Sequence, residues 1–174
     1  AYYAILGAST LGMMFLASSK ELITMYIGLE LATISLFALT AIYKEDEYSL
    51  EAGIKYVILG ALSSGILLYG ISLVYGATGT TYIDSIMAST AALKNISPLL
   101  VFGAIMMLLG IGFKLSMVPM HVWTPDVYQG APTQVTAFVS VASKAAGFVF
   151  ALRIFSYAFI KFEPFLAPAI AVLA

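Results

Sequence analysis

One stretch decides the fold of this 174-residue chain: residues 110–147, which read GIGFKLSMVPMHVWTPDVYQGAPTQVTAFVSVASKAAG. It places Lys114 and Lys144 inside long apolar runs, and Pro119, Pro125 and Pro132 interrupt the segment between them. An amine in hydrocarbon costs on the order of 2.5–3.5 kcal/mol on insertion scales, so an intramembrane lysine is a candidate functional residue by default. The composition of the chain decides whether these runs lie in a membrane.

The composition is that of an integral membrane protein. The chain is 61% hydrophobic and only 10% charged, with a mean hydropathy of +1.00, against roughly 45–50% apolar and 25% charged residues in soluble domains. The net charge is -1 without a basic cluster, so nothing points to nucleic acid binding. The absence of Cys and the single histidine, His121, exclude iron–sulfur ligation and multi-histidine haem or zinc sites. We therefore expect no metal site and no cofactor in this chain.

Apolar runs of about 20 residues, the length that crosses a core of about 30 Å, predict an all-α polytopic transmembrane bundle. A mixed segment up to Lys94 is long enough for a short interfacial helix, and residues 164–174 have the character of the start of a further helix. Ala1 opens directly into an apolar run, so we expect residues 1–174 to be one partial five-helix domain from a longer or processed chain. The five predicted spans are 1–19, 22–43, 49–76, a broken span from about 97, and 132–160.

The fourth span is predicted to be broken. An unbroken helix from Pro98 to Gly130 would be about 50 Å long, too long for a core of about 30 Å. Pro119 cannot donate to the carbonyl of Leu115, and its ring crowds that turn. We therefore predict a break near Pro119, about one turn after Lys114. Irregular backbone at membrane depth is tolerated only inside protein or beside a wet cavity.

Three ionisable residues are expected near the middle of the bilayer. At a rise of 1.5 Å per residue, Glu30 lies about 15 Å into the second span and Lys144 about 18 Å into the fifth, while Lys114 lies beside the break. Three such charges facing lipid would cost roughly 8–10 kcal/mol, comparable with the stability of a domain. We therefore predict that they face the bundle interior and one another, as in an intramembrane proton relay. The structural alternative is a static Glu30–Lys114 ion pair that fixes helix packing, with Lys144 satisfied by backbone groups and by hydroxyls such as those of Ser140 and Ser143.

Two further polar residues, Lys55 and His121, are candidates for proton transfer, and for each a structural role is an equal alternative. Lys55 has Glu51 four residues before it, a spacing that allows an ion pair on one helix face, and that pair is as well explained by structure as by proton transfer. His121 falls seven residues after Lys114, on the same face if the helix persisted, and its titration range suits a proton carrier. An interfacial histidine beside Trp123 is the equal alternative.

Residues 113–148 contain the pattern H-x-W-T-P-D-V-Y-x-G-x-P, followed by S-V-A-S-K-A-A. This run resembles the antiporter-like membrane subunits of the proton-pumping NADH:quinone oxidoreductase, respiratory complex I. The lysine at position 144 favours a resemblance to the subunit N branch of the family, because the larger antiporter-like subunits and the Mrp sodium/proton antiporters usually have histidine at that position. Glu30 in Y-I-G-L-E-L and Lys55 in K-Y-V-I-L-G also match, whereas Gln134 stands where the family usually has proline.

The resemblance implies that the chain corresponds to the first of two inverted five-helix repeats. It implies that Glu30 and Lys114 are the glutamate and broken-helix lysine of a proton relay, Lys144 its next residue, and Lys55 and His121 further positions on the path. The expected function is that of a translocase subunit that moves protons, coupled to quinone reduction elsewhere, with no redox active site in this chain. NADH, FMN, iron–sulfur clusters and quinone are expected in partner subunits. The expected surroundings are neighbouring antiporter-like subunits and the lipid of a bacterial plasma membrane.

Two other functions stay open at this point. The first is a subunit of an Mrp-type sodium/proton antiporter, which has no redox partners. The second is a non-conducting structural half-domain whose charges only hold helices together.

Overall fold

The computed structural model describes residues 1–92 and 97–173 of the chain. In these residues the chain is helical apart from turns and one isolated backbone bridge between Glu21 and Tyr82, so the predicted all-α class is confirmed. η1 and η2 are π-helical turns and η3 is a 3-10 turn. The elements are α1 (Tyr2–Ser18), α2 (Leu22–Thr40), α3 (Glu47–Thr78), α4 (Ile83–Ala92), α5 (Pro98–Leu115), α6 (Thr124–Gly130), α7 (Thr133–Phe138), η1 (Val139–Ser143), α8 (Lys144–Ala151), η2 (Leu152–Ala158), η3 (Ile160–Phe162) and α9 (Glu163–Leu173).

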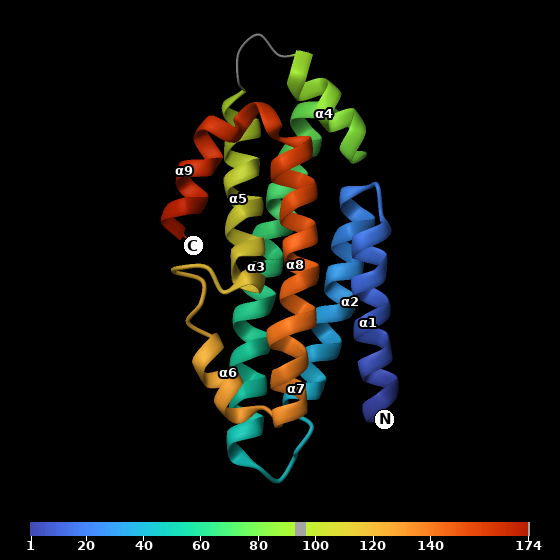
Figure 1. The fold of residues 1–174 in the computed structure, drawn as a ribbon, viewed down its shortest axis with the longest axis vertical. Coiled ribbons are helices and arrows are strands. Elements are labelled where there is room, and N and C mark those ends of the chain that lie inside the picture. The colour runs from blue at the N-terminus through green and yellow to red at the C-terminus, as the bar shows by residue number, and fades with distance from the viewer. Residues whose placement is uncertain (93–96, 174) are drawn as a thin grey trace.

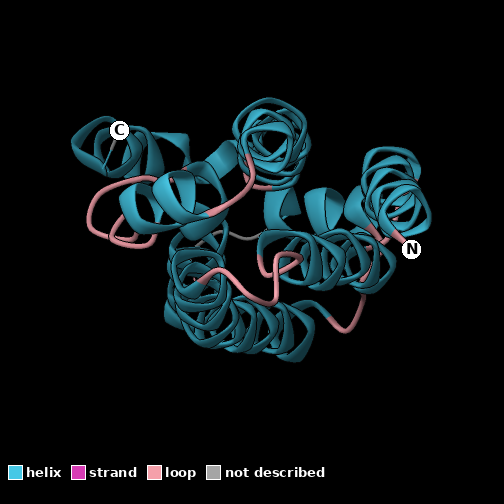
Figure 2. Cartoon of the chain, turned by 90° about the horizontal axis from the view of Figure 1, so that it is seen from below, coloured by secondary structure: helices cyan, strands magenta, loops and turns pink. Residues whose placement is uncertain are grey.

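The helices form an elongated bundle (Figure 1). α1 and α2 pack along one another as an antiparallel pair, and α3 and α5 form a second pair. α2 also packs on α3, while α8 contacts both α5 and α1. The end-on view in Figure 2 shows the helix axes running roughly side by side. α8, which carries Lys144, is therefore placed between the two pairs.

Among residues 1–92 and 97–173, four helical segments are long and apolar enough to cross a membrane: Leu22–Thr40, Glu47–Thr78, Pro98–Leu115 and Thr133–Ala158. The last of these is one continuous rod built from α7, η1, α8 and η2. The first predicted span, α1, is apolar but has 17 residues, about 26 Å at 1.5 Å per residue. The predicted polytopic bundle is thus four full-length spans and one shorter apolar helix.

Glycines let helix backbones touch at two crossings. A Cβ on Gly12 of α1 would lie 2.6 Å from backbone atoms of both Ala32 and Gly28 on α2. A Cβ on Gly70 of α3 would lie 2.7 Å from the backbone nitrogen of Met107 on α5. Backbone atoms cannot move aside without separating the helices, so both pairs depend on small residues, as is common in membrane bundles.

The predicted break in the fourth span is confirmed, and it begins three residues before Pro119. α5 ends at Leu115, directly after Lys114, because Ser116 adopts a left-handed conformation with φ 58° and ψ 38°. The chain then turns through residues 116–123 before α6 starts. Lys114 therefore occupies the last turn of a half-helix.

The carbonyls freed at this break are satisfied by protein groups. The backbone N–H of Met117 donates to the carbonyl of Gly112 at 2.8 Å, the contact that defines a Schellman helix end. The indole Nε1 of Trp123 donates to the carbonyl of Phe113 at 2.9 Å. Paired backbone groups make an interrupted helix tolerable at membrane depth.

Two shorter helices, α4 and α9, lie beside the long spans. The short helix predicted before Lys94 is α4, whereas Lys94 itself lies outside the described residues. The backbone N–H of Leu22 donates to the carbonyl of Thr81 at 2.9 Å, which holds the segment before α4 against the start of α2. The segment predicted as a further helix is α9, and the N–H of Val118 in the break donates to the carbonyl of Leu173 at 2.9 Å.

Candidate functional site

Lys114 is buried, with 5% of its surface exposed. Its Nζ donates a hydrogen bond of 2.5 Å to the hydroxyl of Thr33 on α2. The ring centres of Phe37 and Phe113 lie 5.7 and 5.6 Å from the same nitrogen, within the range of cation–π attraction. One hydroxyl and two ring faces therefore surround a cation that an apolar site would otherwise exclude.

Glu30 lies one turn before Thr33 on the same face of α2, but it is not paired directly with Lys114. Its carboxylate accepts a hydrogen bond of 2.6 Å from the hydroxyl of Ser64 on α3. Among the described residues, no lysine or arginine nitrogen lies within 4.0 Å of this carboxylate, although its charge attracts the Lys114 ammonium. The direct ion pair of the structural alternative is therefore not formed.

A small cavity of about 20 Å³ adjoins Lys114 where α1, α2 and α5 meet the last span. Its polar lining is Lys114, Thr33 and Ser143. A volume of this size holds about one water molecule, which needs two to four polar partners. Ser143 directly precedes Lys144, so the cavity extends from the first lysine to the backbone beside the second. The remaining lining is apolar: Met13, Leu16, Leu29, Ala32, Ala146 and Gly147.

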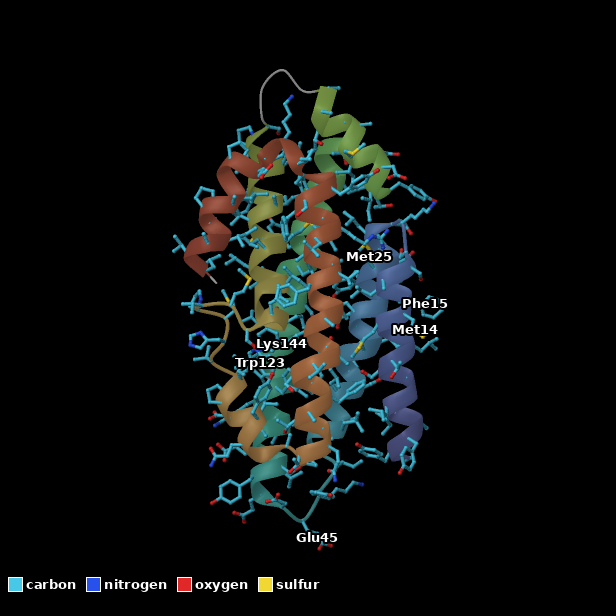
Figure 3. The ribbon with its side chains drawn as sticks, viewed as in Figure 1. Met14, Phe15, Met25, Glu45, Trp123 and Lys144 are labelled. Carbon is cyan, nitrogen blue, oxygen red and sulfur yellow. The ribbon has the colours of Figure 1, made fainter. Side chains whose placement is uncertain are left out.

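Lys144 lies at mid-height of the bundle, directly after the π-helical turn η1 (Figure 3). Its half-buried side chain places Nζ 5.8 Å from the ring centre of Tyr128 on α6. In the described part of the chain no carboxylate lies within 4.0 Å of it. The hydroxyl of Ser140 donates to the carbonyl of Ala137 and does not bind the amine. Lys144 is thus held by a ring face beside a π turn, a backbone irregularity often found at functional sites.

Lys55 on α3 forms two ion pairs toward one end of the bundle. Its Nζ lies 2.6 Å from Glu51 and 2.6 Å from Asp126 on α6. The pair with Glu51 is the one that the four-residue spacing predicted. The three side chains are 41%, 60% and 48% exposed, so the pairs contribute little to stability. Their structural effect is to tie α6, the half-helix after the break, to α3.

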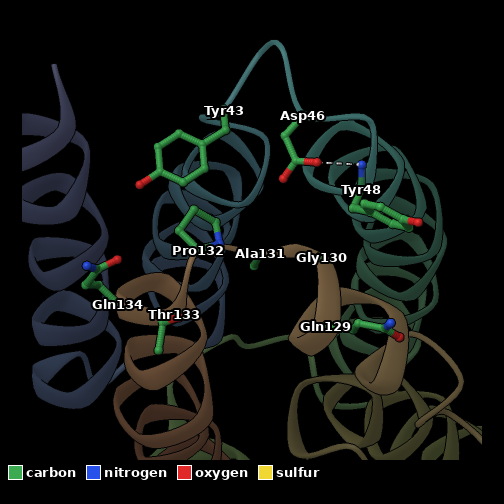
Figure 4. Close-up of a pocket in the computed structure, with 9 residues that line it drawn as sticks. All are labelled: Tyr43, Asp46, Tyr48, Gln129, Gly130, Ala131, Pro132, Thr133 and Gln134. Atoms are coloured by element: carbon green, nitrogen blue, oxygen red, sulfur yellow. Dashed lines mark hydrogen bonds between the residues drawn. The ribbon is translucent and has the colours of Figure 1, made fainter.

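Two open pockets lie at this end of the bundle. The larger, about 430 Å³, opens between the loop after α2 and the start of α7 (Figure 4). The smaller, about 180 Å³, lies beside Lys55. In the larger pocket Asp46 accepts a hydrogen bond of 3.1 Å from the backbone N–H of Tyr48 and so caps α3. Both pockets are lined by Tyr48, Gln129 and Gly130. Water therefore reaches the Lys55 ion pairs from this end.

His121 and Trp123 differ from the sequence-based expectation. His121 is exposed in the turn after the break. Because α5 ends at Leu115, the helix does not persist to His121, and the condition for one shared face with Lys114 is not met. Trp123 is only 2% exposed, so it is a core residue and not an interfacial neighbour of the histidine.

The hydroxyl partners of the charged residues were not found from the sequence. Thr33 was recognisable in principle, because it follows Glu30 by three residues and so shares its helical face. Ser64 and Asp126 meet their partners from other helices. Identifying them requires knowing how α2, α3 and α6 are aligned against one another, and no local sequence pattern predicts that alignment.

Known proteins match most of this chain in sequence. The family described as "NADH:quinone oxidoreductase/Mrp antiporter, TM" matches residues 19–174. The NADH-quinone oxidoreductase subunit N of Moorella thermoacetica is 56% identical over 154 residues, covering 88% of this chain and 32% of the relative. That of Desulforamulus reducens is 50% identical over 173 residues, covering 99% of this chain and 36% of the relative. The chain thus spans about a third of the length of these relatives.

Solved structures give the same result. A chain of respiratory complex I from Thermus thermophilus matches with a TM-score of 0.77 and 39% identity, over 87% of this chain and 33% of that one. A chain of the Mrp complex from Dietzia sp. matches with a TM-score of 0.86 over 97% of this chain and 31% of that one, at 22% identity. The second likeness shows the fold alone. With its apolar spans, broken helix and family match over residues 19–174, the chain belongs to the NADH:quinone oxidoreductase/Mrp antiporter transmembrane family of integral membrane proteins.

Proposed function

We propose that this chain is part of a proton-translocating membrane subunit of NADH:quinone oxidoreductase, coupled to quinone reduction elsewhere in the complex. The observation that carries the proposal is the buried ammonium of Lys114, which is bound by the hydroxyl of Thr33 and by no carboxylate of the described residues. A buried cation with a purely structural role is expected to have its counter-charge in direct contact, because an uncompensated buried charge is strongly destabilising. Here the counter-charge, Glu30, is hydrogen-bonded to Ser64.

In the proposed relay, Glu30, Lys114 and Lys144 carry the proton. The negative charge of Glu30 stabilises the protonated form of Lys114. When that charge is withdrawn or neutralised, the Lys114 Nζ–H bond breaks and the proton passes to water in the adjoining cavity, leaving a neutral amine. Ser143 is the polar group of the cavity nearest in the chain to Lys144, whose amine takes up the proton next. Lys55 and His121 are assigned to the ends of the path, His121 on family likeness and exposure alone.

The other parts of the reaction are assigned outside this chain. The oxidoreductase is the whole complex, and NADH, FMN, iron–sulfur clusters and quinone are assigned to partner subunits. The proposed neighbours are other antiporter-like membrane subunits of the complex, and the surrounding lipid is that of a bacterial plasma membrane. Residues 1–174 form the first of two inverted five-helix repeats in this proposal.

The test uses the full-length subunit assembled in the complex, in inverted membrane vesicles driven by NADH. We expect Glu30→Gln and Lys114→Met each to abolish most proton pumping, read from quenching of a pH-sensitive dye. Lys144→Arg keeps the charge but does not release a proton near neutral pH, so it is expected to fail as well. The control is Lys20→Met, which removes an exposed lysine before α2. Normal pumping in Glu30→Gln and Lys114→Met would contradict the proposed relay.

A second measurement separates complex I from the antiporter alternative. Purification of the full-length subunit is expected to bring with it hydrophilic subunits that carry flavin and iron–sulfur clusters. Co-purification with other membrane subunits only, together with sodium-dependent proton exchange, would favour the Mrp-type function.

A further inference from the structure

Two buried phenol hydroxyls lie beside the proposed relay without a hydrogen-bond partner in the described part of the chain. They belong to Tyr56 on α3, which is fully buried, and to Tyr128 on α6, whose hydroxyl oxygen is shielded from solvent. A buried hydroxyl without a partner is costly, and nearly all buried polar groups in proteins have one. The two hydroxyls are therefore free to donate and accept hydrogen bonds that the fold itself does not form.

Ring contacts fix where these hydroxyls lie. The ring of Tyr56 stacks on Trp123 at 4.6 Å between centroids with 10° between planes, and it meets Phe37 edge-on at 4.8 Å. Trp123 in turn meets the ring of Tyr128 edge-on at 6.1 Å. Trp123 therefore contacts both tyrosine rings. Because the Tyr56 ring is held between Trp123 and Phe37, its hydroxyl cannot turn away to find a partner elsewhere.

The two tyrosines lie beside two different lysines, Lys144 and Lys55. Tyr128 faces Lys144, whose Nζ lies 5.8 Å from the centre of its ring. Tyr56 directly follows Lys55 in α3, and the Lys55–Asp126 ion pair of 2.6 Å joins α3 to the helix that carries Tyr128. Tyr128 therefore adjoins the lysine at mid-height, and Tyr56 is the sequence neighbour of Lys55, which lines the open pocket of about 180 Å³.

We propose that the hydroxyls of Tyr56 and Tyr128 form a hydrated proton-carrying site that connects Lys144 with the Lys55–Asp126 end of the bundle. This inference rests on the proposed function. A neutral phenol both accepts and donates hydrogen bonds. As the Lys144 Nζ–H bond breaks, a new O–H bond forms on the phenol oxygen and its own hydroxyl proton leaves on the other side. Lys144 becomes a neutral amine, each phenol is unchanged, and the proton ends on water in the pocket beside Lys55.

The test compares Tyr56→Phe, Tyr128→Phe and the double variant in the full-length subunit within the complex. Phe keeps the ring contacts and removes only the hydroxyl. The matched control is Tyr69→Phe, which removes a phenol from the exposed face of α3. Three quantities are measured in NADH-driven vesicles: the rate of proton pumping, its ratio between H₂O and D₂O, and the thermal midpoint of the subunit.

We expect pumping to fall about tenfold in the single variants, the order expected when one hydrogen bond is lost from a proton-transfer path. The solvent isotope ratio should rise, because the slowed proton step then limits the rate, while the thermal midpoint and the Tyr69→Phe control stay unchanged. Pumping within twofold of normal in the double variant would overturn the inference, as would lost pumping with an unchanged isotope ratio and a lowered midpoint. Loss of pumping in Lys114→Met together with normal pumping in the phenol variants would overturn this site and leave the proposed function standing.

Discussion

Replacing Lys114 by Met distinguishes a proton carrier from a structural cation. Met is apolar and similar in length, so it removes the charge and keeps the space filled. A lysine at membrane depth costs about 2.5–3.5 kcal/mol, and a hydrogen bond to a charged group returns about 1.5–3 kcal/mol. Thr33 stays satisfied in the variant, because its hydroxyl donates to the carbonyl of Leu29 at 2.6 Å. We therefore expect the free energy of unfolding to be unchanged or to rise by up to about 2 kcal/mol.

A structural cation would give the opposite result. Removing one member of a buried ion pair costs about 3–5 kcal/mol, which corresponds to a fall on the order of 10 °C in the thermal midpoint of a domain of this size. The assay heats the assembled complex and follows the folded fraction of the subunit, in parallel with NADH-driven proton pumping. The control, Lys20→Met, is expected to change neither quantity. A midpoint lowered by about 10 °C in Lys114→Met would refute the argument that Thr33 and the two rings hold this cation without a fixed counter-charge.

Three further predictions test the packing and the helix ends. Gly28→Leu is expected to destabilise the subunit by about 1–3 kcal/mol or more, because a Cβ there would lie 2.7 Å from the backbone nitrogen of Leu16. The control is Gly7→Leu, since a Cβ at Gly7 meets nothing within 4 Å. Equal thermal midpoints in the two variants would contradict the close crossing of α1 and α2. Trp123→Phe should lower stability by about 0.5–1.5 kcal/mol, because the Phe113 carbonyl at the break loses its indole donor and keeps the hydrogen bond from the N–H of Ser116 at 3.2 Å. An unchanged thermal midpoint would show that the indole hydrogen bond is replaced. Hydrogen bonds from Thr24 and Thr81 lower the pKa of Glu21 from its usual value of 4.5, so their stabilising effect is present above about pH 4.5 and is lost as the pH falls through the lowered pKa. Amide hydrogen exchange at Leu22 should therefore speed up at acid pH in the native chain, and Thr81→Val should move that change to higher pH.

The course of the helices could be predicted from the sequence because lipid imposes a single strong requirement. Apolar length identifies a span, and a helix too long for the core with Pro119 inside it has to break. The position of the break was less accessible, because the left-handed residue is Ser116 and not a glycine or asparagine. Nothing in the sequence indicates the π-helical turn before Lys144, since it depends on how the rod fits its neighbours.

The charged residues of the site could be predicted because their placement in hydrocarbon is costly wherever they occur. Their partners could not, since each comes from a different helix. Ser64 reaches Glu30 only in one register of α3 against α2, and Asp126 reaches Lys55 only because α6 continues along α3 after the break. Tyr56 and Tyr128 are ordinary aromatic residues by sequence, and only the structure reveals that their hydroxyls lack partners.

The unbroken length of α3 sets the height at which the molecule sits in the bilayer. Its 32 residues measure about 48 Å, and even a tilt of about 40° leaves about 37 Å along the membrane normal, more than the hydrocarbon core of about 30 Å. One end must therefore emerge among the lipid headgroups, and the acidic first turns with Asp46, Glu47 and Glu51 are better suited to water than the apolar last turns. Lys55, eight residues after the start of α3 and about 12 Å along the helix, then lies near the boundary between the headgroup layer and the hydrocarbon core, where its ion pairs separate bulk solvent from the interior of the protein.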